Sequence, residues 1–335
     1  MKKMKTIEQM RPDELYQKIL KQRKVDGKLF YKKYCNQFIE ISCPACGQQG
    51  EVCFSKYGFE HRTCNSCGTL FCSPRPSESL LTEYYTYWKS PKLWTSLLLK
   101  TDINRKKLQY LPRVKKIISV MKEDNKKCGG VAVDVGAGSG AFAFCLKQSS
   151  FFSDIITVDL SEECISACKR LGFNAKQNLN DIPDNFAYLL TLNDIVEHLF
   201  NPYQFLVECY KKLKKNGYIA IATPNGEGFD FKIMKEKTVN ITPPEHLNYF
   251  NTYSIRFLLE KVGFKVIDLS TPGKLDVQIV LKSLKSDNRI LRGNEYIKFL
   301  LSQNEEVLEN FQYFLSSNKL SSHMLCIAKK IRREL

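Results

Sequence analysis

Four cysteines in two short pairs form the pattern that most clearly predicts a metal site. They are Cys43, Cys46, Cys64 and Cys67, arranged as two Cys-x-x-Cys pairs that are each followed by glycine. Each pair places two thiolates on one tight turn, and two such turns give a tetrahedral set of sulfurs that suits zinc. A site closed by four thiolates has no open position for water. We therefore predict a structural zinc site in a zinc ribbon.

Three nearby residues leave the ligand set partly open. Cys53, Cys72 and His61 lie in the same stretch of sequence, and any of them could replace one ligand. The alternative to a metal site is a set of unrelated buried thiols, which are common in protein interiors.

A glycine-rich segment is the second candidate site. The run DVGAGSG, from Asp134 to Gly140, follows a strand-like stretch and precedes a helix-like stretch. Glycines let the backbone turn sharply and approach a ligand closely. Asp159 ends the next predicted strand, where a carboxylate can accept hydrogen bonds from both hydroxyls of a ribose. The segment therefore predicts a nucleoside-cofactor site.

The spacing of the glycines and the charge beside them indicate which nucleoside cofactor binds. Dinucleotide sites have Gly-x-Gly-x-x-Gly, whereas this chain has Gly-x-Gly-x-Gly. Asp134 would repel a pyrophosphate and attract a cation, such as the ammonium group of a methionine moiety. The residues therefore favour S-adenosylmethionine (SAM) over NAD.

From residue 130 onward, strand-like and helix-like stretches alternate. We expect further strands at 155–161, 187–193, 218–225 and 265–270, and helices at 141–148, 161–171, 203–215 and 252–262. Alternation of this kind is typical of a parallel, doubly wound α/β sheet.

Four runs in this region carry a family resemblance. In order they are VDVGAGSGAF, VDLS, LNDIVEHLFNPYQFL and LKKNGYIAIATPN. They resemble class I SAM-dependent methyltransferases. The resemblance implies a Rossmann-like, seven-stranded doubly wound sheet with SAM over the carboxyl ends of its strands. A Rossmann-like domain that binds no SAM is the alternative.

The resemblance also implies the residues around the cofactor. They are Asp134, Gly136, Ala137, Gly138 and Gly140 on the methionine side, Asp159 and Leu160 at the ribose, Asn178 or Leu179 near the adenine, and Asn193 and Asp194 beside the methyl-bearing sulfur.

Two Glu-His pairs are the candidates for catalysis. Methyl transfer needs aligned reactants and often a base. Glu197-His198 and Glu245-His246 follow predicted strands whose carboxyl ends form the site edge of α/β sheets. We predict His246 as the general base and Glu245 as its orienting partner or a second base. His198 is a further candidate, and a hydrogen-bonded packing role is the alternative for each histidine.

The combination of modules narrows the expected substrate. A four-cysteine module, a tyrosine-rich stretch with Tyr84 and Tyr85, a SAM domain and a Glu-His loop resemble bacterial sugar methyltransferases. That group includes enzymes that methylate carbon in nucleotide-linked ketosugars through an enolate, as well as enzymes associated with surface polysaccharides. Pro243 and Pro244 stand where the C-methylating enzymes carry a tyrosine, so C- and O-methylation both stay open.

Net charge and the lengths of apolar runs bear on the other possible functions and on the location of the protein. The 335 residues carry a net charge of +16, which suits RNA, although the lysines are scattered. An RNA methyltransferase, another small-molecule O-methyltransferase and a non-catalytic protein that binds zinc and SAM are the other hypotheses. No apolar run approaches the ~20 residues of a membrane span, and no secretory signal is seen, so we expect a cytoplasmic protein of open oligomeric state.

The expected domain organisation has four parts. They are a basic helical leader at 1–40, the zinc ribbon at 41–76, a helical linker or substrate lid at 77–125, and the methyltransferase domain at 126–335 with a helical insertion at about 275–319.

Overall fold

A seven-stranded sheet organises the second half of the chain in the computed structural model, which describes residues 5–124 and 129–331. Its strand order is β10-β11-β8-β7-β4-β5-β6. The strands are β4 (Val131–Val135), β5 (Asp154–Val158), β6 (Asn174–Lys176), β7 (Ala187–Asn193), β8 (Leu213–Pro224), β10 (Phe264–Ser270) and β11 (His323–Lys330). β4 to β8 run parallel, and β11 is antiparallel to both of its neighbours. The predicted Rossmann-like α/β fold is confirmed.

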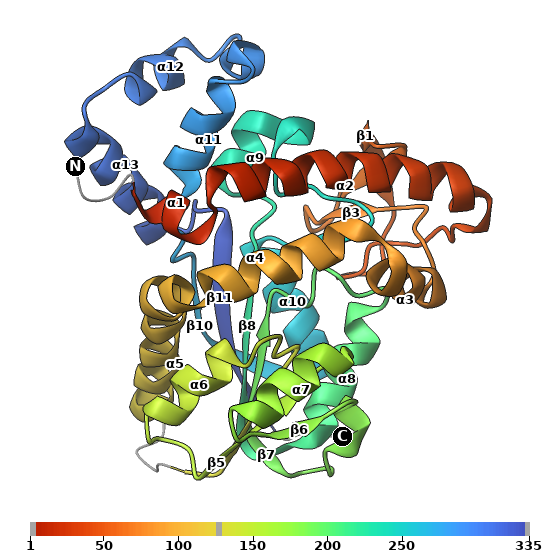
Figure 1. The fold of residues 1–335 in the computed structure, drawn as a ribbon, viewed down its shortest axis with the longest axis vertical. Helices are drawn as coiled ribbons and strands as arrows, with labels where there is room; N and C mark the ends of the chain where they lie inside the picture. The colour runs from red at the N-terminus through yellow and green to blue at the C-terminus, as the bar shows by residue number, and fades with distance from the viewer. Residues whose placement is uncertain (1–4, 125–128, 332–335) are drawn as a thin grey trace.

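Helices cover both faces of this sheet (Figure 1). α5 (Leu111–Asp124), α6 (Ala141–Gln148) and α7 (Glu162–Arg170) lie on one face, and α8 (Pro202–Lys212) and α10 (Thr252–Val262) lie on the other. Successive side chains of a strand point to opposite faces, so Leu189 packs toward the first group and Leu190 toward the second. The short 3₁₀ turn Leu179–Asp181 precedes β7.

One predicted boundary is wrong. The helix expected at 203–215 ends at Lys212, and β8 begins at Leu213 and runs through Asn216-Gly217. Leu213 is buried and pairs with Ala187 of β7, so the strand starts before the turn-like dipeptide. Tertiary pairing here overrides the local turn signal.

A second, four-stranded sheet joins the cysteine-rich segment to the second half of the chain. Its order is β1 (Gly50–Lys56), β2 (Phe59–Cys64), β3 (Leu70–Cys72) and β9 (Asn248–Tyr249). β9 comes from the long connection after β8, and Phe71 pairs with Asn248. Because β9 begins two residues after His246, this pairing fixes the end of the loop that contains Glu245 and His246.

The N-terminal helices lie across the carboxyl edge of the large sheet (Figure 1). They are α1 (Lys5–Met10), α2 (Asp13–Tyr34), α3 (Glu78–Tyr87) and α4 (Lys89–Arg105), with a 3₁₀ turn at Cys35–Gln37. α4 runs through a π-helical turn at Lys106–Tyr110 into α5. No helix within the described ranges is both long enough and apolar enough to cross a bilayer.

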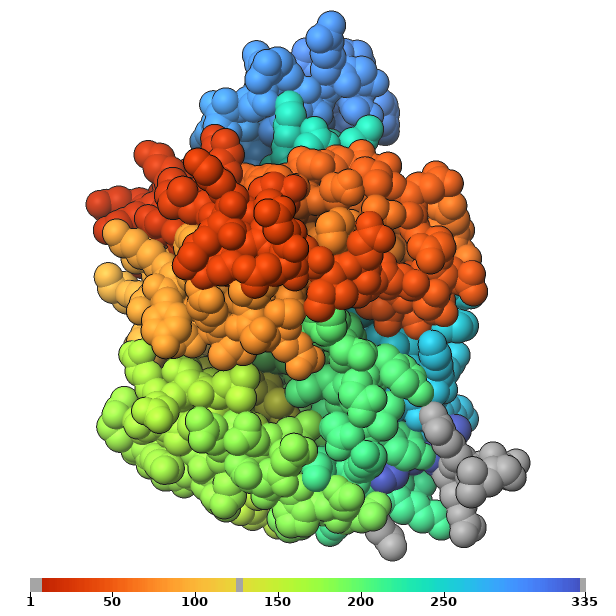
Figure 2. Space-filling model, turned by 90° about the vertical axis from the view of Figure 1, so that its right-hand side faces the viewer, coloured from red at the N-terminus to blue at the C-terminus, as the bar shows by residue number. Residues whose placement is uncertain are grey.

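A small helical lobe lies at one end of the molecule (Figure 2). It contains α9 (Phe229–Met234), α11 (Asp276–Leu284), α12 (Glu295–Leu301) and α13 (Glu305–Ser317), with 3₁₀ turns at Lys235–Lys237 and Asn288–Leu291. These helices share a core of their own, in which Phe229 packs with Val280 and Leu315.

A buried ion pair ties α2 to the Glu-His loop. Nε and Nη2 of Arg23 donate to the two carboxylate oxygens of Glu245 at 3.1 and 2.5 Å. Both side chains are less than a tenth exposed. Burial alone would lower the pKa of Arg23, but the charge and hydrogen bonds of Glu245 outweigh it and the pKa is raised. Removing one partner would leave the other charge buried and uncompensated.

We expect Arg23→Ala to lower the free energy of unfolding by about 3–5 kcal/mol, because Glu245 keeps its buried charge without a partner. The matched control is Arg256→Ala, which breaks an exposed pair with Glu260 and is expected to cost at most about 1 kcal/mol. Denaturant unfolding of the three proteins measures both values. Equal losses in the two variants would show that the buried pair does not anchor the loop.

Candidate functional site

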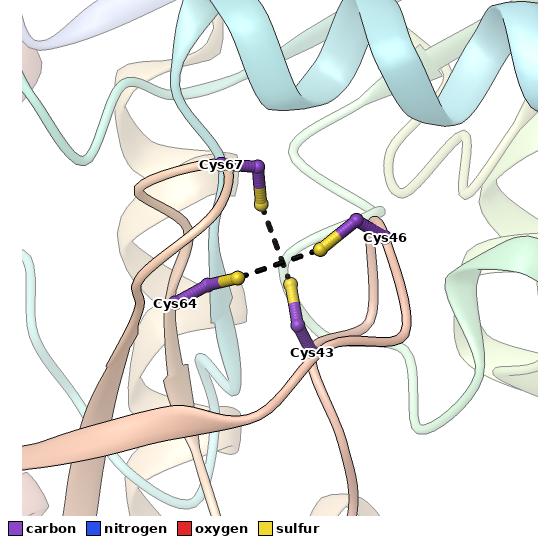
Figure 3. Close-up of side chains that lie close together, drawn as sticks. All are labelled: Cys43, Cys46, Cys64 and Cys67. Atoms are coloured by element: carbon purple, nitrogen blue, oxygen red, sulfur yellow. Dashed lines mark hydrogen bonds between the residues drawn. The ribbon is translucent and has the colours of Figure 1, made fainter.

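The sulfur atoms of the four predicted cysteines point toward one another (Figure 3). Sγ of Cys43 lies 3.5 Å from Sγ of Cys67, and Sγ of Cys46 lies 3.4 Å from Sγ of Cys64. All four sulfurs lie within 4.8 Å of one another. A tetrahedral zinc site with Zn–S bonds of about 2.3 Å separates its sulfurs by about 3.8 Å. The donor set therefore fits zinc.

Local backbone geometry explains why the sulfurs converge. Gly47 and Gly68 have φ values of +82° and +71°, which glycine adopts readily. Their N–H groups donate to the carbonyls of Cys43 and Cys64, closing two tight turns. Cys53, Cys72 and His61, the possible substitutes, lie outside the four-sulfur group found among the described residues.

The glycine-rich loop connects β4 to α6, and it borders open space at Gly138. Gly136, Gly138 and Gly140 all have positive φ, between +54° and +80°. The N–H of Gly138 donates to Oδ2 of Asp159 at 2.8 Å. A Cβ placed on Gly138 would meet no atom of the described residues within 4 Å. The loop thus leaves room for a ligand beside its backbone, as a cofactor cradle requires.

Asp134 lies buried beneath this loop at the end of β4. Its Oδ1 accepts hydrogen bonds from Thr191 at 2.6 Å and from Asn193 at 3.4 Å. Its Oδ2 is buried and has no hydrogen-bond partner within residues 5–124 and 129–331. Burial raises the pKa of Asp134 to about 7. An unsatisfied carboxyl oxygen here fits a cationic ligand, and the predicted contact with an ammonium group stays a prediction.

Two further cofactor candidates end β7. Asn193 accepts a hydrogen bond from Arg113 at 2.5 Å, and Asp194 accepts one from Nε2 of His323 at 2.9 Å. Burial would raise the pKa of Asp194, but the hydrogen bond and charge of His323, together with the charges of Arg113 and His198, outweigh burial, and the pKa is lowered. Arg113 and His323 escaped sequence reasoning, because they come from α5 and β11, far away in the chain.

The remaining cofactor candidates also lie around this edge. Ala137 donates its N–H to the carbonyl of Val158, next to Asp159. Leu160 is 76% exposed, which suits a residue that packs against a ligand. Asn178 begins the 3₁₀ turn that contains the buried Leu179. The strand order reverses between β4 and β7, and ligands of doubly wound sheets bind at such a switch point.

Two histidines from separate loops lie side by side near this switch point. The rings of His198 and His246 are 4.7 Å apart between centroids and nearly perpendicular, at 80°. Nδ1 of His198 lies 2.8 Å from the carbonyl oxygen of Glu245, and Nδ1 of His246 lies 3.0 Å from that of Asn240. A carbonyl only accepts, so each Nδ1 carries the proton and each Nε2 keeps a free lone pair.

The electrostatic surroundings keep both rings neutral. Burial lowers the pKa of His198, and burial together with the nearby His198 lowers the pKa of His246 well below its usual value. Neutral rings are the form that can accept a proton or bind a cation at Nε2.

Glu197 lies next to the two rings and is fully buried. Its Oε2 accepts a hydrogen bond from Thr223 of β8 at 2.8 Å. Its Oε1 is buried and lacks a hydrogen-bond partner in the described part of the chain. Burial raises the pKa of Glu197 well above its usual value. One ligand atom each from Glu197, His198 and His246 lies within 4.8 Å of the others.

The Glu245 carboxylate binds a residue of α2 rather than the adjacent His246. That carboxylate binds Arg23, and the hydroxyl of Tyr84 lies 3.5 Å from Oε1. The hydrogen bond that fixes the His246 ring therefore comes from the Asn240 carbonyl rather than from the Glu245 side chain. The hydroxyl of Tyr85 lies 2.7 Å from Nδ1 of His198, so α3 also contributes a side chain beside the two histidine rings. The catalytic roles predicted for Glu245, His246 and His198 stay predictions.

Comparison with known proteins identifies the domain. Residues 105–269 match a family described as a methyltransferase domain. Together with the strand order, this match supports a methyltransferase domain of Rossmann-like α/β fold in this part of the chain, which is just under half of its length.

Curated relatives match only part of the chain. A mitochondrial ubiquinone biosynthesis O-methyltransferase of Candida albicans is 26% identical over 126 residues, covering 33% of this chain and 38% of that protein. A probable S-adenosylmethionine-dependent methyltransferase of Mycolicibacterium smegmatis is 30% identical over 87 residues, covering 26% of this chain and 32% of that protein. The chain thus spans less than half the length of either relative.

Solved structures of similar fold include one archaeal and one bacterial protein. A SAM-dependent methyltransferase from Archaeoglobus fulgidus has a TM-score of 0.44 and 20% identity, covering 76% of this chain and all of that one (100%). A possible histamine N-methyltransferase from Thermotoga maritima has a TM-score of 0.47 and 17% identity, covering 75% of this chain and 98% of that one.

We expect Cys43→Ser to release zinc and to unfold the four-stranded sheet at lower temperature, since metal binding contributes to the folding of such modules. The control is Cys53→Ser, because Cys53 is exposed and lies outside the four-sulfur group. Elemental analysis of the purified proteins gives the metal content. Unchanged zinc in the Cys43 variant would contradict the assigned ligands.

Proposed function

We propose that this protein transfers a methyl group from SAM to a sugar, either nucleotide-linked or a precursor of a surface glycan. The observation that carries the proposal is the position of the two neutral imidazoles. They lie on loops that follow β7 and β8, at the same edge of the sheet as the glycine-rich loop. Only three residues separate Asp194, a predicted cofactor residue, from His198 in the chain.

SAM supplies a methyl group on a positively charged sulfur. On this chain, the Gly138 backbone and the Asp159 carboxylate would hold the nucleoside, and Asp134 would face the charged methionine end. On the acceptor side, Nε2 of His246 is the free lone pair that can draw a proton from a sugar hydroxyl or from carbon beside a ketone. The Asn240 carbonyl holds that ring in the productive tautomer.

Support for a sugar comes from the polar groups around the rings and from the resemblance of the module order to sugar methyltransferases. The hydroxyl of Tyr85, the two imidazoles and the buried Glu197 gather hydrogen-bonding groups that suit a polyhydroxylated acceptor. The four-cysteine group would hold zinc as a folding element, because its four thiolates leave no position for an acceptor.

His246→Ala is expected to reduce turnover at least about 100-fold while leaving SAM affinity unchanged, since the ring acts on the acceptor and not on the cofactor. Calorimetric titration with SAM and a steady-state assay separate the two effects. The control is His323→Asn, which alters the contact with Asp194 and is expected to change SAM binding instead. Near-normal turnover in the Ala variant would remove His246 from the mechanism.

The acceptor class is tested by offering labelled SAM in parallel to a nucleotide-sugar pool and to unmodified bulk RNA. Label in the sugar pool supports the proposal, and the product's mass and NMR spectrum distinguish C- from O-methylation. Label in RNA, with binding that weakens steeply as salt rises, would overturn the sugar proposal and make the cysteine module an RNA-docking element. SAM binding without label in any acceptor pool would indicate a non-catalytic binding protein.

A further inference from the structure

We propose that Glu197, His198 and His246 form a second metal site, distinct from the four-cysteine site, that binds one divalent transition-metal ion. One ligand atom of each residue lies within 4.8 Å of the other two. Two imidazoles and one carboxylate are the protein ligands of many catalytic zinc sites, which keep an open position for water or substrate.

The orientation of the rings carries the first part of the argument. Histidines that bind metals almost always donate their other ring N–H to a carbonyl or a carboxylate. Both rings do so here, through Nδ1, to the backbone carbonyls of Glu245 and Asn240. With Nδ1 of each ring bonded to a carbonyl, Nε2 is the nitrogen that is left to bind a metal.

The Glu197 carboxylate carries the second part. One of its oxygens is satisfied by Thr223, and the other is fully buried with no hydrogen-bond partner in the described residues. An unsatisfied buried carboxyl oxygen is costly in the absence of a ligand. A cation between this oxygen and the two Nε2 atoms would satisfy all three groups at once.

The chemistry of the donors separates this site from the cysteine site. Nitrogen and oxygen donors accept zinc, iron, cobalt and manganese, whereas four thiolates select zinc and disfavour manganese. Glu197 and His198 follow β7, and His246 follows β8, so this site belongs to the methyltransferase domain.

The function of such an ion rests on the proposed methyl transfer. A sugar hydroxyl at the open position would lose its proton more readily, because the positive charge stabilises the oxygen anion. With its Nε2 on the ion, His246 would act by holding the ion rather than by taking the proton itself. The proton would leave to water, and the oxygen would form a bond to the methyl carbon. The carbon–sulfur bond breaks, and its electron pair stays on the sulfur. This chemistry favours O-methylation.

The test uses full-length protein loaded with zinc and then desalted. We expect about two zinc ions per chain in the wild type and about one in Glu197→Gln, which preserves side-chain size and the Thr223 contact. Titration with Mn²⁺, followed by electron paramagnetic resonance, is made on separate samples that keep only the zinc of the cysteine site. It should show a site in the wild type that is at least about 10-fold weaker in the variant. His246→Ala should show the same loss of Mn²⁺ binding. Because His246 is only partly buried, this variant tests the site with less risk to folding than a change at the fully buried Glu197.

Glu306→Gln is the matched control, because Glu306 is exposed on α13, away from the site. One zinc ion and no Mn²⁺ binding in the wild type, or equal binding in wild type and Glu197→Gln, would overturn the second site. In that case His246 is left to accept the proton directly. SAM titrations of the same samples keep this failure apart from a failure of the proposed function, because metal binding is measured without turnover.

Discussion

Two backbone carbonyls determine what chemistry the two candidate imidazoles can do, because they decide which nitrogen of each ring is free. The Asn240 and Glu245 carbonyls belong to one connection, between β8 and β9, and each holds the Nδ1 of one histidine. A shift of this connection that broke these contacts would release both rings from their present orientation. The rest of the structure can be understood as the means by which that loop is kept in place.

The N-terminal part of the chain provides most of that support. β9 pairs with β3, so the cysteine-rich module fixes the loop at its carboxyl end. Arg23 of α2 binds the Glu245 side chain, and Tyr85 of α3 lies against His198. Asp230 of α9 accepts hydrogen bonds from Thr238 and Asn240, which holds the earlier part of the loop. The leader and the cysteine-rich module therefore help to hold the two histidines in place.

Sequence patterns predict the parts of this arrangement that are local. Cys-x-x-Cys spacing, the glycine run and the alternation of strands anticipate the four-sulfur group, the tight turn after β4 and the α/β fold. Contacts between distant segments carry no such signal. Arg23 lies 222 positions before Glu245, and nothing in its surroundings distinguishes it from the other basic residues of the leader. The Asn240 carbonyl is a backbone group, so no side-chain pattern could reveal it.

The most direct measurement is the protonation state of the two rings, read by NMR of protein with ¹⁵N-labelled histidine and assigned with His198→Asn and His246→Asn variants. The structure predicts that both rings are neutral at about pH 7, with the proton on Nδ1 and none on Nε2, because burial lowers both pKa values below the usual histidine pKa of about 6.5. Rings protonated on Nε2, or charged at that pH, would contradict the account, because no lone pair would then face the acceptor.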